Sequence, residues 1–300
     1  DCPAESIPAG SNWRAASGFP RCYDSGAGFF PEGPQHGITL GNVDSDPDLE
    51  ILVAATATAD KQSIFIFDHD GSELADWPPP GFPGGTGPFA LASVSGAMNG
   101  DAIFVGTDTS NIVTGENYLA LATVADGVLP GWPLVASNYV DVYPSAFDAD
   151  GDGTDELFTD EGNRRLHVYK ATGEVLAGWP VSEQLCDDVG INGGQQIGPF
   201  TFADLDDDGS VDVAAISRAP DGADQSCLMA MRMDGTPLTG FPVALRDTRN
   251  DPTITTGDVD GDGDFDIYGA NWTGNPPARI WINRLDPERR AMRIDRWSES

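Results

Sequence analysis

Short apolar runs alternate with polar stretches rich in glycine and proline along nearly the whole chain. Early in the sequence, four runs of strand length follow one another at residues 37–40, 49–55, 63–67 and 74–77. The inner runs carry apolar residues at successive positions, which is typical of strands covered on both faces. Four such strands in roughly 40–55 residues make up one blade of a β-propeller.

The same pattern recurs with a nearly constant period. Nine-residue loops begin at residues 42, 93, 148, 204 and 258, so that successive starts are 51, 55, 56 and 54 residues apart. A second marker, glycine followed by an aromatic residue and proline, recurs in phase at 71–78, 127–133, 173–180 and 235–242. Repeats of this length indicate a stack of identical supersecondary units rather than one irregular domain.

We therefore predict an all-β fold, a β-propeller of four-stranded blades and five blades in number. The propeller comprises residues 36–300, with repeats starting near residues 36, 87, 142, 198 and 252. A longer protein, of which this chain is a fragment, is the alternative to a five-bladed ring.

The two ends of the chain are candidates for closing the ring. The last repeat has no marker after its third predicted strand at 279–283, whereas Gly18-Phe19-Pro20 stands alone in the N-terminal segment 1–35. We expect that segment to supply the closing strand. The alternative is that residues 291–297 complete the last blade.

The loops carry most of the recognisable chemistry. Four of them place oxygen-bearing side chains at positions 1, 3, 5 and 9, and three have glycine at position 6, where the loop turns so that the position-7 carbonyl points inward. Carboxylates this close repel one another unless a cation lies between them. Hard oxygen ligands in this number favour Ca²⁺ over Mg²⁺ or a transition metal. We therefore predict about four structural Ca²⁺ ions, in loops between strands 1 and 2 of most blades.

The predicted metal ligands share these loop positions, with position 7 included. They are Asn42, Asp44, Asp46, Asp48 and Glu50; Asp148, Asp150, Asp152, Thr154 and Glu156; Asp204, Asp206, Asp208, Ser210 and Asp212; and Asp258, Asp260, Asp262, Asp264 and Asp266. Residues 93–101 keep the loop length but have lost the ligands, so the second repeat is predicted to be metal-free. EF-hands are excluded, because no loop has glutamate at position 12 and strands follow the loops where helices would be needed.

The Asp-x-Asp-x-Asp-Gly-x-x-Asp-like loops at 148, 204 and 258, the weaker one at 42 and the recurring marker resemble the FG-GAP/VCBS repeat family. This family of calcium-loop propellers includes the head of integrin α-subunits. The resemblance spans roughly residues 36–285 and implies a calcium-binding propeller. Integrin heads have seven blades, whereas five periods fill this chain. The family spans adhesion heads, lectin-like modules and propellers attached to enzymes, so the resemblance does not choose a function.

Charge narrows the range of partners. The chain has 48 acidic and 16 basic residues, a formal charge of -32, and 19 of the acids lie in the four metal loops. Nucleic acid is excluded as a partner because its binding needs a basic face. The sequence has no run of 18 apolar residues, so we expect no transmembrane segment.

The cysteines point to an oxidising compartment. An even number, Cys2, Cys22, Cys186 and Cys227, suggests two disulfides, and Cys186 and Cys227 fall in adjacent predicted loops where a bridge is sterically reasonable. We expect a secreted, cell-surface or periplasmic protein. The chain begins at Asp1 without methionine, and a signal peptide is expected to have been removed.

Catalytic signals are weak. None of the three histidines has a recognisable nucleophile beside it, and no Gly-x-Ser-x-Gly or His-Glu-x-x-His is present, so we expect that the chain is not an enzyme. A binding or adhesion module for an extracellular protein or glycan is the main prediction, with contacts on long loops opposite the metal loops, at Tyr139, Tyr143, Arg249 and Trp272. The alternatives are a polysaccharide lyase or hydrolase with a propeller fold, and a purely structural propeller of a larger protein.

Overall fold

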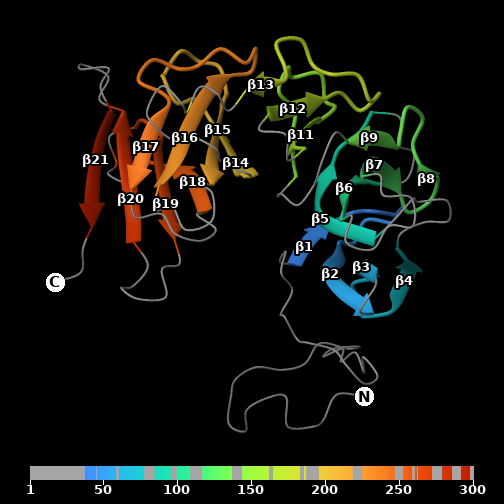
Figure 1. The fold of residues 1–300 in the computed structure, drawn as a ribbon. Helices are drawn as coiled ribbons and strands as arrows, with labels where there is room; N and C mark the ends of the chain where they lie inside the picture. Colours follow the sequence, from blue (N-terminus) through green and yellow to red (C-terminus); the bar gives the residue numbers. More distant parts are fainter. Residues whose placement is uncertain are drawn as a thin grey trace, which may run out of the picture. The chain divides into compact units, whose positions relative to one another are not determined.

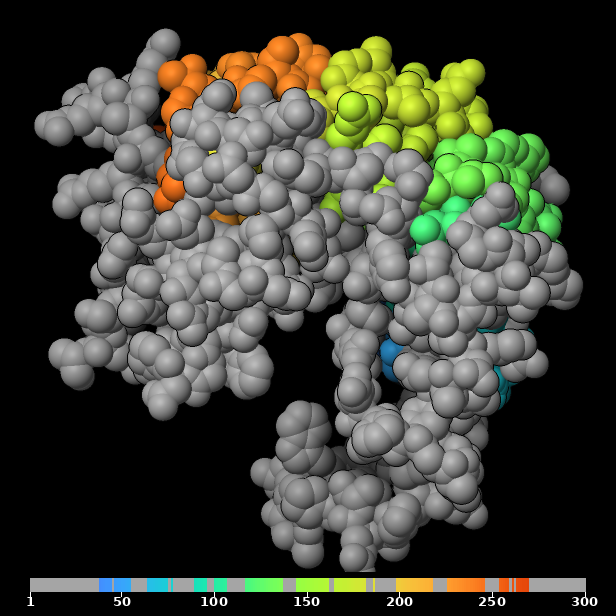
Figure 2. All heavy atoms as spheres, viewed as in Figure 1, coloured from blue at the N-terminus to red at the C-terminus, as the bar shows by residue number. Residues whose placement is uncertain are grey.

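The structure is a computed structural model, and its space-filling view in Figure 2 colours only part of the described residues. The described residues are 38–44, 46–58, 61–77, 85–95, 100–108, 117–136, 144–161, 165–182, 186, 196–218, 225–246, 253–258, 261, 263–271, 279–285 and 292–297. The chain divides into two compact units, Asp1–Val135 and Ala136–Ser300. Each unit consists of consecutive antiparallel sheets (Figure 1).

The first unit contains two sheets. The first sheet has the strand order β1-β2-β3-β4, with bounds Ile38–Gly41, Glu50–Thr58, Lys61–Phe67 and Glu73–Asp76. The second has the order β5-β6-β7-β8, with bounds Gly85–Ala92, Ala102–Asp108, Asn117–Thr123 and Gly127–Val128, and β9 (Leu134–Ala136) also pairs with β7.

The second unit contains three sheets. Strands β10 to β13 are Ser145–Phe147, Glu156–Asp160, Arg165–Tyr169 and Val181–Ser182. Strands β14 to β17 are Gln196–Ala203, Asp212–Arg218, Gln225–Arg232 and Val243–Arg246. Strands β18 to β21 are Thr253–Gly257, Asp266–Asn271, Arg279–Leu285 and Met292–Trp297. Within each sheet the strands follow chain order, as in a propeller blade.

The predicted all-β class is confirmed, since every element of the described residues is a strand. The first strands of the five sheets begin at Ile38, Gly85, Ser145, Gln196 and Thr253. The blade number of the propeller stays a prediction. The fourth strand of the last sheet is β21, which pairs with β20 from Ile280↔Trp297 to Leu285↔Met292, as the alternative for this sheet proposed. Gly18-Phe19-Pro20 lies outside the described residues.

Apolar residues on both faces of the inner strands pack one sheet on the next. In β15, Val213 and Ala215 join a buried cluster with Phe158 of the preceding sheet. The alternate residue Ile216 joins a second cluster with Ile267 of the following sheet. In the first unit, Leu52 and Ile66 pack in the same way with Ile103 and Val105. The successive apolar positions in the sequence therefore reflect burial on both faces of a sheet.

The glycine–aromatic–proline marker fixes adjacent sheets of the second unit to each other. The Trp179 ring meets Phe158 edge-on, with ring centroids 6.2 Å apart, and its indole Nε1 donates a hydrogen bond to the Met233 carbonyl at 2.9 Å. Gly178 has φ +93°, and a Cβ there would lie 2.0 Å from the Asp234 carbonyl oxygen. Glycine is required at this position because the β-turn of the next sheet comes into direct contact with it.

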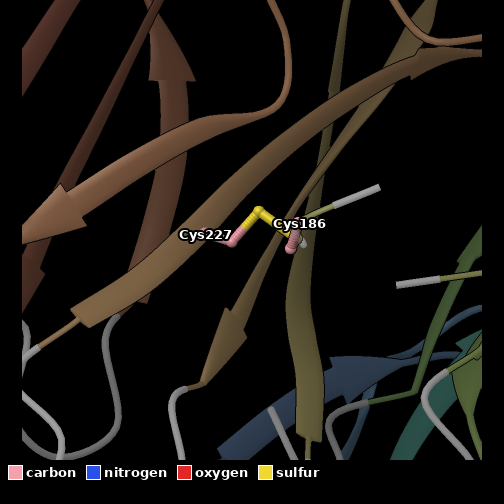
Figure 3. Close-up of a disulfide and its surroundings, with 2 residues drawn as sticks. All are labelled: Cys186 and Cys227. Carbon is pink, nitrogen blue, oxygen red and sulfur yellow. A yellow bond between two sulfur atoms is a disulfide. The ribbon is translucent and has the colours of Figure 1, made fainter. Parts of the chain in front are cut away.

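Cys186 and Cys227 form a disulfide with a Cα–Cα distance of 5.9 Å (Figure 3). Cys227 lies in β16 rather than in a loop, which corrects the predicted position while the expected pairing is present. The bond ties the connection between β13 and β14 to the third strand of the next sheet. Cys2 and Cys22 lie outside the described residues.

Replacing Gly178 by alanine is expected to destabilise the protein by about 1–3 kcal/mol more than replacing Gly240 by alanine. The two glycines have similar positive φ angles of +93° and +96°, so both variants carry a similar backbone penalty. A Cβ at Gly240 would have no heavy atom within 4 Å. Denaturant unfolding of both variants measures the difference. Equal losses of stability would contradict the packing role given to Gly178.

Candidate metal centres

Each candidate metal loop connects the first and second strands of a sheet. The loops join β1 to β2, β10 to β11, β14 to β15 and β18 to β19. The position-9 acid opens the second strand in every case, as Glu50, Glu156, Asp212 and Asp266. An acidic group at the start of a strand is thereby brought under the loop that precedes it.

The position-9 carboxylate binds back to the loop in three of the sheets. Glu50 Oε2 accepts the Val43 amide at 2.8 Å, Glu156 Oε2 accepts the Ala149 amide at 2.9 Å, and Asp212 Oδ2 accepts the Leu205 amide at 3.0 Å. The three acidic residues are buried, with 0%, 3% and 0% of their surface exposed. The same contact therefore connects each of these loops to its sheet.

The position-1 carboxylate holds the turn of the loop. Asp148 accepts the Gly151 and Asp152 amides through Oδ1, at 2.8 and 3.1 Å, and the Gly153 amide through Oδ2 at 2.9 Å. Asp204 and Asp258 make the corresponding contacts in their own loops, to Asp208 and Gly209 and to Gly261 and Gly263. Glycine at position 6 has φ between +85° and +103° in the three loops, as the sequence predicted for the sharp turn.

These contacts gather several carboxylates at one point. One oxygen from each of Asp44, Asp46 and Glu50 lies within 4.8 Å of the others, and the same holds for Asp148, Asp150 and Glu156 and for Asp204, Asp206 and Asp212. The three acidic clusters can each bind a metal ion. In the fourth loop, Asp258, Asp264 and Asp266 are described, whereas Asp260 and Asp262 lie outside the described residues.

Two of the buried carboxylates have one oxygen atom that accepts no hydrogen bond. Glu50 Oε1 and Asp212 Oδ1 have no hydrogen-bond partner, and Asn42 Oδ1, at position 1 of the first loop, is also buried without one. A buried carboxylate oxygen without a partner costs free energy that a hydrogen bond or a cation would offset. The donor set consists only of oxygen atoms, and it fits a hard divalent cation.

The raised pKa values of the position-9 acids also indicate that the loops can bind a cation. Burial raises the pKa of Asp212 to about 6, with smaller contributions from Asp206 and Asp208, while the Leu205 amide opposes the rise. Burial also raises the pKa of Glu50 and of Glu156, again with further raising by the other acids of each loop. Each loop therefore holds a buried acid whose ionised form needs a nearby positive charge.

The end of the loop in the second sheet, predicted to be metal-free, contacts the first candidate metal loop. The Asp101 amide donates to the Asn42 carbonyl at 2.6 Å, and Gly100 has φ +100°. A Cβ at Gly100 would lie 2.7 Å from the carbonyl oxygens of Asn42 and Asp44. Gly100 and Asp101 thus pack directly on the neighbouring loop at 42–50, a contact that sequence reasoning did not find.

Two further contacts at the loops were also missed. His69 Nδ1 lies 2.5 Å from Asp68 Oδ1 and 3.4 Å from Asp48 Oδ2, and the hydrogen bond to Asp68 raises the pKa of His69. Arg232, at the end of β16, forms an ion pair with Asp206. Both come from the strand 3 side of the sheet, far from the loops in sequence.

Glu161, His167 and Tyr169 form a buried polar cluster at strands β11 and β12. The Tyr169 hydroxyl donates to Glu161 Oε1 and lies 3.2 Å from His167 Nδ1. Burial lowers the pKa of His167 and raises that of Tyr169.

The predicted ligand contacts Tyr139, Tyr143, Arg249 and Trp272 lie outside the described residues.

No family model matches the chain, and no curated protein matches it. Several solved structures are similar to the chain at low identity and low TM-score. The V. cholerae biofilm matrix protein Bap1 is 20% identical, with a TM-score of 0.46, over 69% of this chain and 28% of that chain. This chain therefore spans little more than a quarter of the length of Bap1.

Two further similar structures are glycoside hydrolases. An exo-1,5-alpha-L-arabinanase from a bovine ruminal metagenomic library is 10% identical with a TM-score of 0.43, over 88% of this chain and 96% of that chain. A family 43 arabinoxylan arabinofuranohydrolase from Bacillus subtilis is 10% identical with a TM-score of 0.35, over 89% of this chain and 69% of that chain.

This finding overturns the expectation that the chain is not an enzyme. That expectation was based on missing sequence motifs. In glycoside hydrolases the catalytic groups are two carboxylates that come together only in the folded protein, so missing motifs do not exclude catalysis.

The described part of the chain contains no membrane-spanning helix.

Asp212→Asn is expected to stabilise the ion-free protein at neutral pH and to remove stabilisation by added Ca²⁺. The raised pKa of Asp212 means that its contribution to stability is present below the unfolded pKa and is lost as pH rises through about 6. At neutral pH the ionised carboxylate then costs the ion-free fold about 3 kcal/mol. Thermal unfolding in EDTA and in Ca²⁺, at acidic and neutral pH, measures both effects.

Asp207→Asn is the matched control for this variant. Asp207 is exposed at position 4 of the same loop, and its φ of 56° is one that asparagine tolerates. Asp207→Asn removes the same charge as Asp212→Asn, but from a residue that is not a proposed ligand. It should therefore leave the calcium-induced stabilisation unchanged. Equal behaviour of the two variants would show that Asp212 does not face a metal site.

Proposed function

We propose that this chain is the calcium-stabilised β-propeller of a secreted protein, with extracellular carbohydrate as its ligand. The calcium assignment is carried by the buried carboxylate oxygens without partners, Glu50 Oε1 and Asp212 Oδ1. Membership of the FG-GAP/VCBS repeats is part of the proposal, supported by the loop spacing and by the glycine turns at position 6.

The same loop positions would hold each ion. In the second unit these are Asp148, Asp150, Asp152 and Glu156, then Asp204, Asp206, Asp208 and Asp212, with the carbonyls of Thr154 and Ser210 at position 7; in the first unit they are Asn42, Asp44, Asp46 and Glu50, with the carbonyl of Asp48. Bound Ca²⁺ would neutralise the clustered carboxylates and offset the burial of the position-9 acid.

Secretion is supported by the disulfide and by the proposed metal. Disulfides such as Cys186–Cys227 persist in oxidising compartments. Calcium sites of extracellular modules bind at roughly 10⁻⁴–10⁻³ M, so they fill only where Ca²⁺ is abundant. Both features favour the outside of the cell or the periplasm.

The ligand surface is proposed on the long connections that carry Tyr139, Tyr143, Arg249 and Trp272. Tyrosine and tryptophan offer large rigid contact areas with a polar edge, which suits the mixed polar and apolar surface of a sugar ring. The formal charge of -32 repels polyanions, so we propose a neutral carbohydrate rather than an acidic polymer. Protein adhesion remains an outcome of the test below.

Removal of calcium is expected to lower the stability of the protein strongly. With Ca²⁺ at about ten times its dissociation constant, each site contributes roughly 1.4 kcal/mol, or about 5–6 kcal/mol for four additive sites. The measurement is a thermal melt with and without EDTA, together with a count of bound Ca²⁺ in the native protein. An unchanged melting temperature and no bound ion would refute the calcium assignment.

The ligand class is tested by incubating the calcium-loaded protein with neutral plant and microbial polysaccharides, including arabinan. Binding is read by affinity electrophoresis, and turnover by new reducing ends or unsaturated products. Retention by a neutral polysaccharide supports the proposal, and release of products would make the protein an enzyme on that substrate. Binding only to protein-coated surfaces would refute the carbohydrate assignment.

A further inference from the structure

Arg232 connects strand β16 to the metal loop that joins β14 to β15. Its guanidinium Nη2 donates to Asp206 Oδ2, and Nε lies 3.6 Å from Asp208 Oδ2. Asp206 and Asp208 occupy positions 3 and 5 of the loop, both of them proposed ion ligands. A positively charged side chain of the protein is therefore in contact with two carboxylates that the ion would also need.

The neighbouring sheet offers a natural comparison, because its β-turn has the same backbone geometry. The Arg232 amide donates to the Thr236 carbonyl and the Gly235 amide to the Arg232 carbonyl, both at 2.9 Å. The Lys170 amide donates to the Glu174 carbonyl at 2.8 Å, and the Gly173 amide donates to the Lys170 carbonyl at 2.9 Å. Lys170 therefore occupies the position equivalent to Arg232.

The two equivalent residues differ in what they touch. Among the residues that the structure describes, no ion pair joins Lys170 to the loop at 148–156, whereas Arg232 contacts two acids of its loop. Guanidinium presents several donors in a rigid plane that matches carboxylates, while the lysine ammonium is a strongly hydrated point charge. The loops that join β10 to β11 and β14 to β15 thus have similar acids but different internal counter-charge.

We propose that Arg232 is an internal counter-ion of the β14–β15 loop, which stabilises the loop without metal and weakens its affinity for Ca²⁺. The inference rests on the proposed calcium function. Without the ion, the guanidinium reduces the repulsion between Asp206 and Asp208. With the ion in place, the same positive charge lies beside a dication and opposes its binding. The sites of one chain would then fill in sequence as Ca²⁺ rises, the β10–β11 loop before the β14–β15 loop.

The test is a calorimetric Ca²⁺ titration of wild type, Arg232→Gln and Lys170→Gln at low ionic strength. Arg232 is 39% exposed in its side chain, so its replacement by glutamine leaves the packed core intact. One site of Arg232→Gln is expected to bind Ca²⁺ about threefold to tenfold more tightly than in wild type. Lys170→Gln should change affinity by less than this.

Two additional measurements assign the effect to the loop. In an Asp212→Asn background, which disables that site, Arg232→Gln should no longer change any Ca²⁺ affinity. In EDTA, Arg232→Gln should lower the melting temperature more than Lys170→Gln does, because only Arg232 contacts loop acids.

The outcomes separate this inference from the proposed function. If wild type binds no Ca²⁺, the calcium function fails and the role of Arg232 fails with it. If wild type binds Ca²⁺ but Arg232→Gln binds it equally or less tightly, calcium function stands and the counter-ion role is refuted. Equal effects of Arg232→Gln and Lys170→Gln would likewise refute it, because general surface charge would then account for the change.

Discussion

Three of the loops depend on one buried carboxylate each. Glu50, Glu156 and Asp212 open the second strands of their sheets and accept the backbone amide of position 2 in the preceding loop. This contact closes each loop onto its strand. It also takes an ionisable group out of water beside other acids, which only a cation or a proton can compensate. The stability of the fold and the proposed metal affinity therefore depend on the same atoms.

The strands that begin at these buried acids also pack against neighbouring sheets. A strand such as β15 begins at the buried acid Asp212, and its alternate side chains join the clusters on its two sides. Trp179 and the disulfide at Cys227 add contacts between adjacent sheets of the second unit. In the first unit Gly100 and Asp101 pack against the loop at 42–50 of the neighbouring sheet.

The loops are alike in plan and differ in their charged neighbours. Arg232 contacts the loop of its own sheet, Lys170 occupies the equivalent turn position without such a contact among the described residues, and Asp68 stands there in the first sheet with His69 beside it. Repetition of the fold therefore does not imply repetition of the electrostatics. In the β14–β15 loop the last residue of the third strand, Arg232, contacts two of the loop acids.

The sequence alone determined the features that depend on local spacing. The period of the loops, the glycine turns and the first-sheet strands could be predicted, and the observed 38–41, 50–58, 61–67 and 73–76 lie close to the predicted runs. Turn type and the alternation of apolar residues depend on residues that are close together in the sequence. Tertiary structure decided which buried oxygens stay without partners, that Arg232 reaches Asp206 across 26 residues, and that Cys227 lies in a strand. It also enclosed Glu161, His167 and Tyr169 together. Those outcomes depend on burial and on distances between remote segments, which no local pattern encodes.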